Sequence, residues 1–106
     1  MHEFVAEQYF SRTDVAGARR AGGAAQHAAE ELARDGVAIE LVRSIFVPED
    51  ETCMFIYVAD SLESVRRSAE RGGLAFDRIA QGAGESEDTP AAKPEAGKVS
   101  PPRGAA

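Results

Sequence analysis

The sequence predicts a small α+β domain, and three observations lead to this fold class. At 106 residues, with 43% hydrophobic and 28% charged residues, the chain has the length and composition of one globular domain. Its hydrophobic period changes along the chain from strand-like to helix-like and back. The resulting order is strand, helix, strand, strand, helix, strand, which is typical of the ferredoxin-like sandwich. In that fold both helices cover one face of a four-stranded antiparallel sheet, and the other face is left bare.

The first half of the chain contains a strand followed by a long helix. Residues 2–10 alternate loosely and are rich in aromatic and β-favouring residues, so we expect a strand there. The helix follows, with Thr13 or Asp14 as its N-cap and Gly36 just after its end. Its inner stripe consists mostly of small residues: Ala18, Gly22, Ala25, Ala29 and Leu32. Such a helix can lie close against a sheet, and the Gly22-Gly23 pair indicates close packing or a local kink.

The second half supplies a hairpin, a helix and a last strand. Residues 37–47 are β-branched and apolar, and Pro48 ends this strand because proline cannot donate a hydrogen bond to a neighbouring strand. The strand at residues 53–59 follows after about five residues, which is a hairpin length, so the two strands should pair antiparallel. A helix over residues 60–73 and a short strand over residues 74–81 complete the order.

The end of the chain differs in composition from the rest. Residues 82–106 contain Val99 as their only large apolar residue and carry four of the five prolines. They cannot bury enough apolar surface to offset the entropy lost on ordering. We therefore expect a folded domain over residues 1–81 and a disordered tail over residues 82–106.

Charge and hydropathy argue against two classes of partner. Acidic residues outnumber basic ones 18 to 12, whereas nucleic-acid-binding proteins usually concentrate lysine and arginine on one face. No apolar run approaches the length of a membrane span, and the amino terminus lacks the pattern of an export signal. We expect a cytoplasmic protein that binds neither nucleic acid nor membranes.

Strand parity predicts which side chains line the bare sheet face. In the first strand Phe4 and Ala6 suit the helix side, which places on the bare face Glu3, Val5, Glu7 and Tyr9. In the strand at 53–59 we expect Met54, Ile56 and Val58 against the helices, which leaves on the bare face Cys53, Phe55 and Tyr57. Arg43 interrupts an apolar series and indicates a bulge, so that either Arg43 or Ser44 could face the bare side. Two such faces placed together would form a dimeric α+β barrel with a semi-polar interior pocket.

Three blocks of the sequence resemble a family of small actinobacterial proteins that includes nickel-binding members. They are EFVAEQYF in the first strand, RSIFVPEDETCMFIYVADS through the hairpin, and GLAFDRI before the end of the domain. The hairpin block is the most specific of the three, whereas the glycine pair of the first helix and the tail depart from the family pattern. The resemblance implies a ferredoxin-like fold, assembly as a dimeric α+β barrel, and nickel binding.

Candidate metal ligands follow from residue chemistry, because nickel and neighbouring metals favour imidazole and thiolate, supplemented by carboxylates. Glu7 would be buried by dimerisation, so it must be paired, hydrogen-bonded or bound to a metal. Cys53 would join it in the interior pocket, while His27, with acids three and four residues later, could hold a cation at the surface. Each has a plainer interpretation: a structural pair of Glu7 with Arg43 or a tyrosine, a small buried side chain at Cys53, and a solvated histidine at position 27. No established metal-binding motif is present.

We therefore expect a nickel-binding homodimer that assembles through the bare sheet face and is not an enzyme. One alternative is a cofactor-free enzyme or small-molecule-binding protein of the dimeric-barrel type, with Tyr9, Arg43 and Tyr57 around its pocket. A plain dimerisation module is the other alternative. The acidic run at residues 49–51 is predicted to be a solvated turn.

Overall fold

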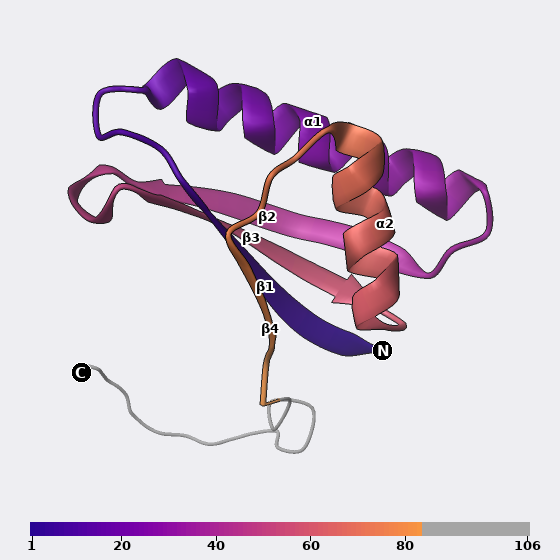
Figure 1. The fold of residues 1–106 in the computed structure, drawn as a ribbon. Helices are drawn as coiled ribbons and strands as arrows, with labels where there is room; N and C mark the ends of the chain where they lie inside the picture. The colour runs from indigo at the N-terminus through magenta and orange to yellow at the C-terminus, as the bar shows by residue number, and fades with distance from the viewer. Residues whose placement is uncertain (84–106) are drawn as a thin grey trace.

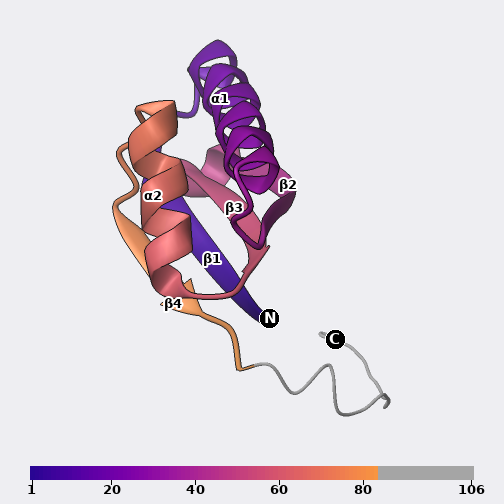
Figure 2. The same ribbon diagram turned by 90° about the vertical axis from the view of Figure 1, so that its right-hand side faces the viewer.

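The computed structural model describes residues 1–83 and confirms the predicted order of elements (Figure 1). The elements are β1 (His2–Tyr9), α1 (Val15–Arg34), β2 (Ile39–Val47), the 3-10 turn η1 (Pro48–Asp50), β3 (Thr52–Ala59), α2 (Leu62–Gly72) and β4 (Arg78–Gln81). The strands form one antiparallel sheet in the order β2-β3-β1-β4. Both helices lie on the same side of this sheet, as expected for a ferredoxin-like sandwich (Figure 2). Most of the predicted tail, residues 84–106, lies outside the described residues, so the boundary at residue 81 stays a prediction.

Helix α1 begins and ends at predicted signals. The Asp14 side chain caps its first turn by accepting a hydrogen bond of 3.0 Å from the Gly17 backbone N–H. Beyond its end, Gly36 has a φ of 96°, a left-handed conformation that glycine adopts without strain. The predicted inner stripe is confirmed, since four of its members are buried: Ala18, Ala25, Ala29 and Leu32. These small side chains let the helix lie close to the sheet.

Of the two adjacent glycines of α1, only Gly22 is closely packed. A Cβ atom at Gly22 would lie 2.8 Å from Ser44 Oγ on β2, whereas a Cβ atom at Gly23 would meet nothing within 4 Å. Because alanine is the better helix former by about 1 kcal/mol, we expect Gly23→Ala to raise the free energy of unfolding by up to that amount. Urea denaturation would measure it. Gly22→Ala is the matched control and should gain less, so an equal gain at both positions would contradict the packing described.

The β2–β3 hairpin is also confirmed, and η1 forms its turn. Glu51 follows the turn in a left-handed conformation with a φ of 49°. Its carboxylate accepts a hydrogen bond of 3.1 Å from the Arg12 backbone N–H. The third acid of the run thus ties the hairpin to the β1–α1 loop, while Glu49 and Asp50 are exposed.

The predicted parity is right for β1 and wrong for β3. Phe4 and Ala6 are buried beneath the helices as expected, but on β3 the residues buried to 1% exposure or less are Cys53, Phe55, Tyr57 and Ala59. The half-buried residues of β3 are Thr52, Met54, Ile56 and Val58, which therefore lie on the bare face. The aromatic rings of Phe55 and Tyr57 pack on Phe76, in the segment before β4, with ring centroids 4.9 and 6.2 Å apart, so the aromatic side of β3 belongs to the core. The predicted bulge in β2 is confirmed between Leu41 and Arg43.

Candidate functional site

The sheet face away from the helices is the first candidate site, and we call it the open face. Cross-strand partners share a face, so the register assigns residues from each strand to it. They are Glu40, Arg43, Ile45 and Val47 of β2, Thr52, Met54, Ile56 and Val58 of β3, Glu3, Val5, Glu7 and Tyr9 of β1, and Arg78 and Ala80 of β4. The apolar side chains form a patch across β2, β3 and β1, and charged side chains surround it, with Glu3 and Glu7 on the central strand β1.

Glu7 forms an ion pair that sequence reasoning missed. It lies opposite Arg78 in the β1–β4 register, and Arg78 Nη1 is 3.6 Å from Glu7 Oε2. Arg43, the partner considered from the sequence, lies on β2 at the other side of β3. The Glu7 side chain is 35% exposed and that of Arg78 is 66% exposed, so this pair contributes little while the face is open to solvent.

Cys53 and Tyr57 lie on the helix side of the sheet, opposite to Glu7. Both are buried to 1% exposure or less, and burial raises the pKa of the Cys53 thiol. Tyr9, at the end of β1, is 61% exposed, and its backbone N–H donates a hydrogen bond of 2.7 Å to Asp77 Oδ2. The structure therefore does not bring Glu7 and Cys53 together, nor does it gather Tyr9, Arg43 and Tyr57 around one pocket.

His27 lies on the solvent-facing side of α1. Its Nε2 atom is 3.0 Å from Glu31 Oε2, one helical turn later, and its side chain is 68% exposed. Arg71 of α2 approaches the other carboxylate oxygen of Glu31 at 3.9 Å. Glu30, the other acid within reach by sequence, instead accepts a hydrogen bond of 2.9 Å from Gln26. His27 and Glu31 are thus an imidazole and a carboxylate that the fold does place together.

A complete metal site is not formed within residues 1–83, where no group of three or more histidine, cysteine, aspartate or glutamate side chains is positioned to hold an ion. Glu7, Cys53 and His27 lie in three separate places: on the open face, in the core and on the outer side of α1. As a single ligand set within one chain, these three residues do not fit a metal ion. The His27–Glu31 pair has the donor chemistry that nickel accepts, but it supplies two ligands only.

The buried Tyr57 phenol makes the free energy of unfolding depend on pH in the alkaline range. Burial raises the pKa of Tyr57 to about 12, with the nearby Ser68 hydroxyl acting weakly in the opposite direction, and within the described chain neither oxygen has a partner at hydrogen-bonding geometry. Because the unfolded chain loses this proton from its ordinary pKa of 10.0, the folded state holds the proton more tightly between that value and about 12.

We therefore expect the free energy of unfolding to fall as the pH rises through this interval, by about 2–3 kcal/mol in total from this group. Burial of the Cys53 thiol acts in the same direction. Urea denaturation at neutral pH and across this interval would measure the loss. Tyr57→Phe is the control and should lose less stability over the same range; an equal loss in both proteins would show that Tyr57 is not responsible.

Comparison with known proteins now places the chain in a family. A sequence model described as nickel responsive protein SCO4226-like matches residues 2–81. The chain belongs to the SCO4226-like family. The match covers every helix and strand described above.

A solved structure supports the fold of this SCO4226-like chain. The crystal structure of SCO4226 from Streptomyces coelicolor A3(2) resembles it with a TM-score of 0.55 at 19% sequence identity, covering 74% of this chain and 91% of that one. At that identity the likeness concerns the fold. No curated protein sequence matches the chain. Within residues 1–83, neither helix is long and apolar enough to cross a membrane.

Proposed function

We propose that this protein is a cytoplasmic nickel-binding protein that acts as a homodimer. The observation that carries the proposal is the match of the nickel-responsive family over residues 2–81, the whole of the described fold. Two separate features of the structure support this proposal. The open face offers an association surface, and the outer side of α1 offers a pair of metal donors.

The open face has the composition of a self-association surface. Its middle is apolar, with Val5, Ile45, Met54, Ile56 and Val58 on three adjacent strands. In a monomer these side chains remain partly exposed to water, which is unfavourable for a domain of this size. A second copy related by a two-fold axis would present the same surface and bury both. The Glu7–Arg78 pair would then be shielded from water, where losing either partner is costly.

His27 and Glu31 are the residues that would hold nickel, because imidazole and carboxylate suit this ion and the fold places them 3.0 Å apart. Both belong to α1, and the helix layer lies on the side of the sheet away from the open face (Figure 2). Association through the open face would leave both copies of the pair accessible to solvent. Bound nickel would act as a cargo or signal ion at these donors, and no chemical step at the protein is implied.

Calorimetric titration of tag-free, chelator-treated protein with nickel tests the metal part of the proposal. His27→Ala should weaken binding by at least about tenfold, because an imidazole is the strongest donor of the pair. His2→Ala, which removes the other histidine, is the matched control and should bind as the parent does. Glu31→Gln should weaken binding less than His27→Ala.

Two results would overturn the metal assignment. Loss of binding in Glu7→Gln, with His27→Ala unaffected, would place the ion on the open face instead, and the same result for Cys53→Ser would place it in the core. No saturable heat at millimolar nickel would remove nickel binding from the function of this protein.

A further inference from the structure

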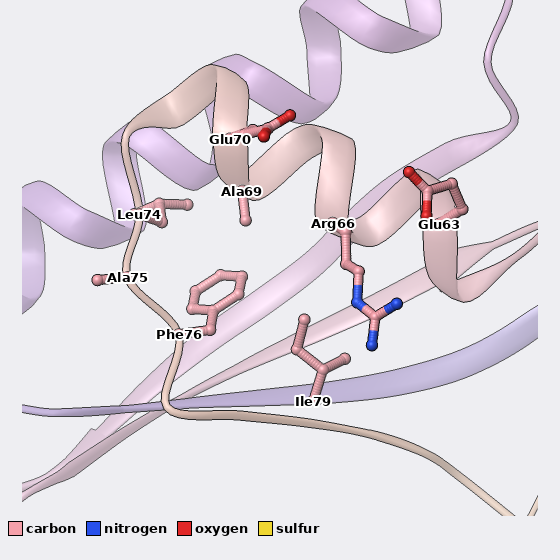
Figure 3. A pocket seen from close by; sticks show the side chains of 8 residues that line it. All are labelled: Glu63, Arg66, Ala69, Glu70, Leu74, Ala75, Phe76 and Ile79. Atoms are coloured by element: carbon pink, nitrogen blue, oxygen red, sulfur yellow. The ribbon is translucent and has the colours of Figure 1, made fainter.

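A groove between α2 and the segment that leads into β4 has no role in the function proposed above. Figure 3 shows its apolar lining, formed by Ala69 of α2, Leu74 and Phe76 of the connecting segment, and Ile79 of β4. Its volume is about 420 Å³, within the range of small-molecule sites. Ile79 pairs with the buried Ala6 and so lies on the helix side of the sheet. Association through the open face would leave the groove accessible.

The lining of the groove is held in place by the core. Gly73 ends α2 with a φ of 67°, and the Leu74 backbone N–H donates a hydrogen bond of 2.9 Å to the Ala69 carbonyl, which turns the chain back beneath the helix. The Phe76 ring then packs on buried Phe55, with ring centroids 4.9 Å apart. A ligand would therefore meet a surface that is already formed, so binding would cost little ordering entropy.

Arg66 supplies the positive charge of the groove. In Figure 3 its guanidinium group extends from α2 toward Ile79, over the apolar lining. Within residues 1–83 it forms no ion pair, although Glu63 and Glu70 lie one turn away on either side and also line the groove. A guanidinium binds a carboxylate through two parallel hydrogen bonds. The two flanking glutamates would repel a phosphate, with its higher charge, more strongly than a single carboxylate.

We propose that this groove binds a small amphipathic carboxylate, with the carboxylate on Arg66 and the apolar part on Phe76 and Ile79. The proposal is independent of nickel binding and of dimerisation. In Figure 3 the carboxylates of Glu63 and Glu70 point away from Phe76 and Ile79, so the Arg66 guanidinium is the charged group that a ligand on the apolar lining would meet. An aromatic or branched aliphatic acid is the ligand class that matches this arrangement. An uncharged ligand of the same shape would lose the guanidinium contact, and a cationic ligand in the same position would be repelled by it.

The test is an NMR titration of the ¹⁵N-labelled full-length protein with 3-phenylpropionate and with two probes of the same shape, its primary amide and the corresponding amine. We expect saturable shifts of the backbone amides of residues 69–79 with the acid, and binding at least about fivefold weaker with the amide and the amine. Arg66→Gln should weaken binding of the acid by a similar factor. Arg67→Gln removes an adjacent arginine that does not line the groove and should bind as the parent does.

Three results would overturn the proposal. The first is the absence of saturable shifts in the groove at millimolar acid. The second is equal or tighter binding of the amide or the amine, which would mean that Arg66 does not select the ligand. The third is equal weakening by Arg66→Gln and Arg67→Gln, which would indicate a general effect of charge. None of these results bears on nickel binding, which is measured at α1.

Discussion

Replacing Phe55 by alanine is expected to lower the free energy of unfolding by about 3–5 kcal/mol. Phe55 has 0% exposure and packs against the Phe76 ring beneath the helices. Its removal leaves a cavity that the backbone of a central strand cannot close. For a small domain this is a large part of the total stability. Chemical denaturation followed by circular dichroism would measure the loss.

The neighbouring residue provides the control for this substitution. Ile56 lies on the open face and is half-buried, so at low protein concentration Ile56→Ala should cost less than Phe55→Ala. At higher concentration the cost of Ile56→Ala should grow, because association stabilises the folded state by mass action. A larger loss in Ile56→Ala than in Phe55→Ala at every concentration would mean that the faces of β3 are assigned the wrong way round.

The two central strands show what the sequence could and could not predict. In β1 the bare face carries Glu3 and Glu7 while the inner face carries Phe4 and Ala6, so polarity alone assigns the sides correctly. In β3 every residue from Cys53 to Ala59 is apolar or aromatic, and alternation carries no contrast between the two sides. In the structure the aromatic side is the buried one, where Phe55 and Tyr57 pack on Phe76. That contact joins segments far apart in the sequence, so no local pattern predicts it.

The candidate site also contains some residue pairs that the sequence could predict and others that it could not. The His27–Glu31 pair follows from helical spacing and could be predicted, because residues four apart on a helix are neighbours. The Glu7–Arg78 pair depends on the register between the first and last strands, which no local pattern encodes. The prediction that Glu7 and Cys53 lie close together was wrong because it depended on the wrong assignment of the two faces of β3. The groove beside Arg66 depends on the turn after Gly73 and had no sequence signal of its own.

Introducing a charge at Ile56 is expected to abolish the proposed homodimer. In a two-fold interface each substitution occurs twice, so Ile56→Glu would place two carboxylates in the apolar middle of the association surface. Burying an unpaired carboxylate costs several kcal/mol. Light scattering coupled to size-exclusion chromatography should then report the mass of one chain instead of two. Circular dichroism should remain that of a folded protein, because Ile56 does not line the core.

Val15→Glu is the matched control for the loss of the dimer. It also converts an apolar residue to an acid, but at a position 46% exposed in the first turn of α1, on the helix side of the sheet. The Val15→Glu protein should remain a dimer, and a dimeric Ile56→Glu protein would refute assembly through the open face.

The monomeric Ile56→Glu protein also separates the two parts of the proposed function, nickel binding and dimerisation. His27 and Glu31 lie on the helix layer of a single chain, so its nickel affinity per chain should equal that of the parent. Loss of nickel binding together with the dimer would instead mean that ligands from two copies converge on one ion.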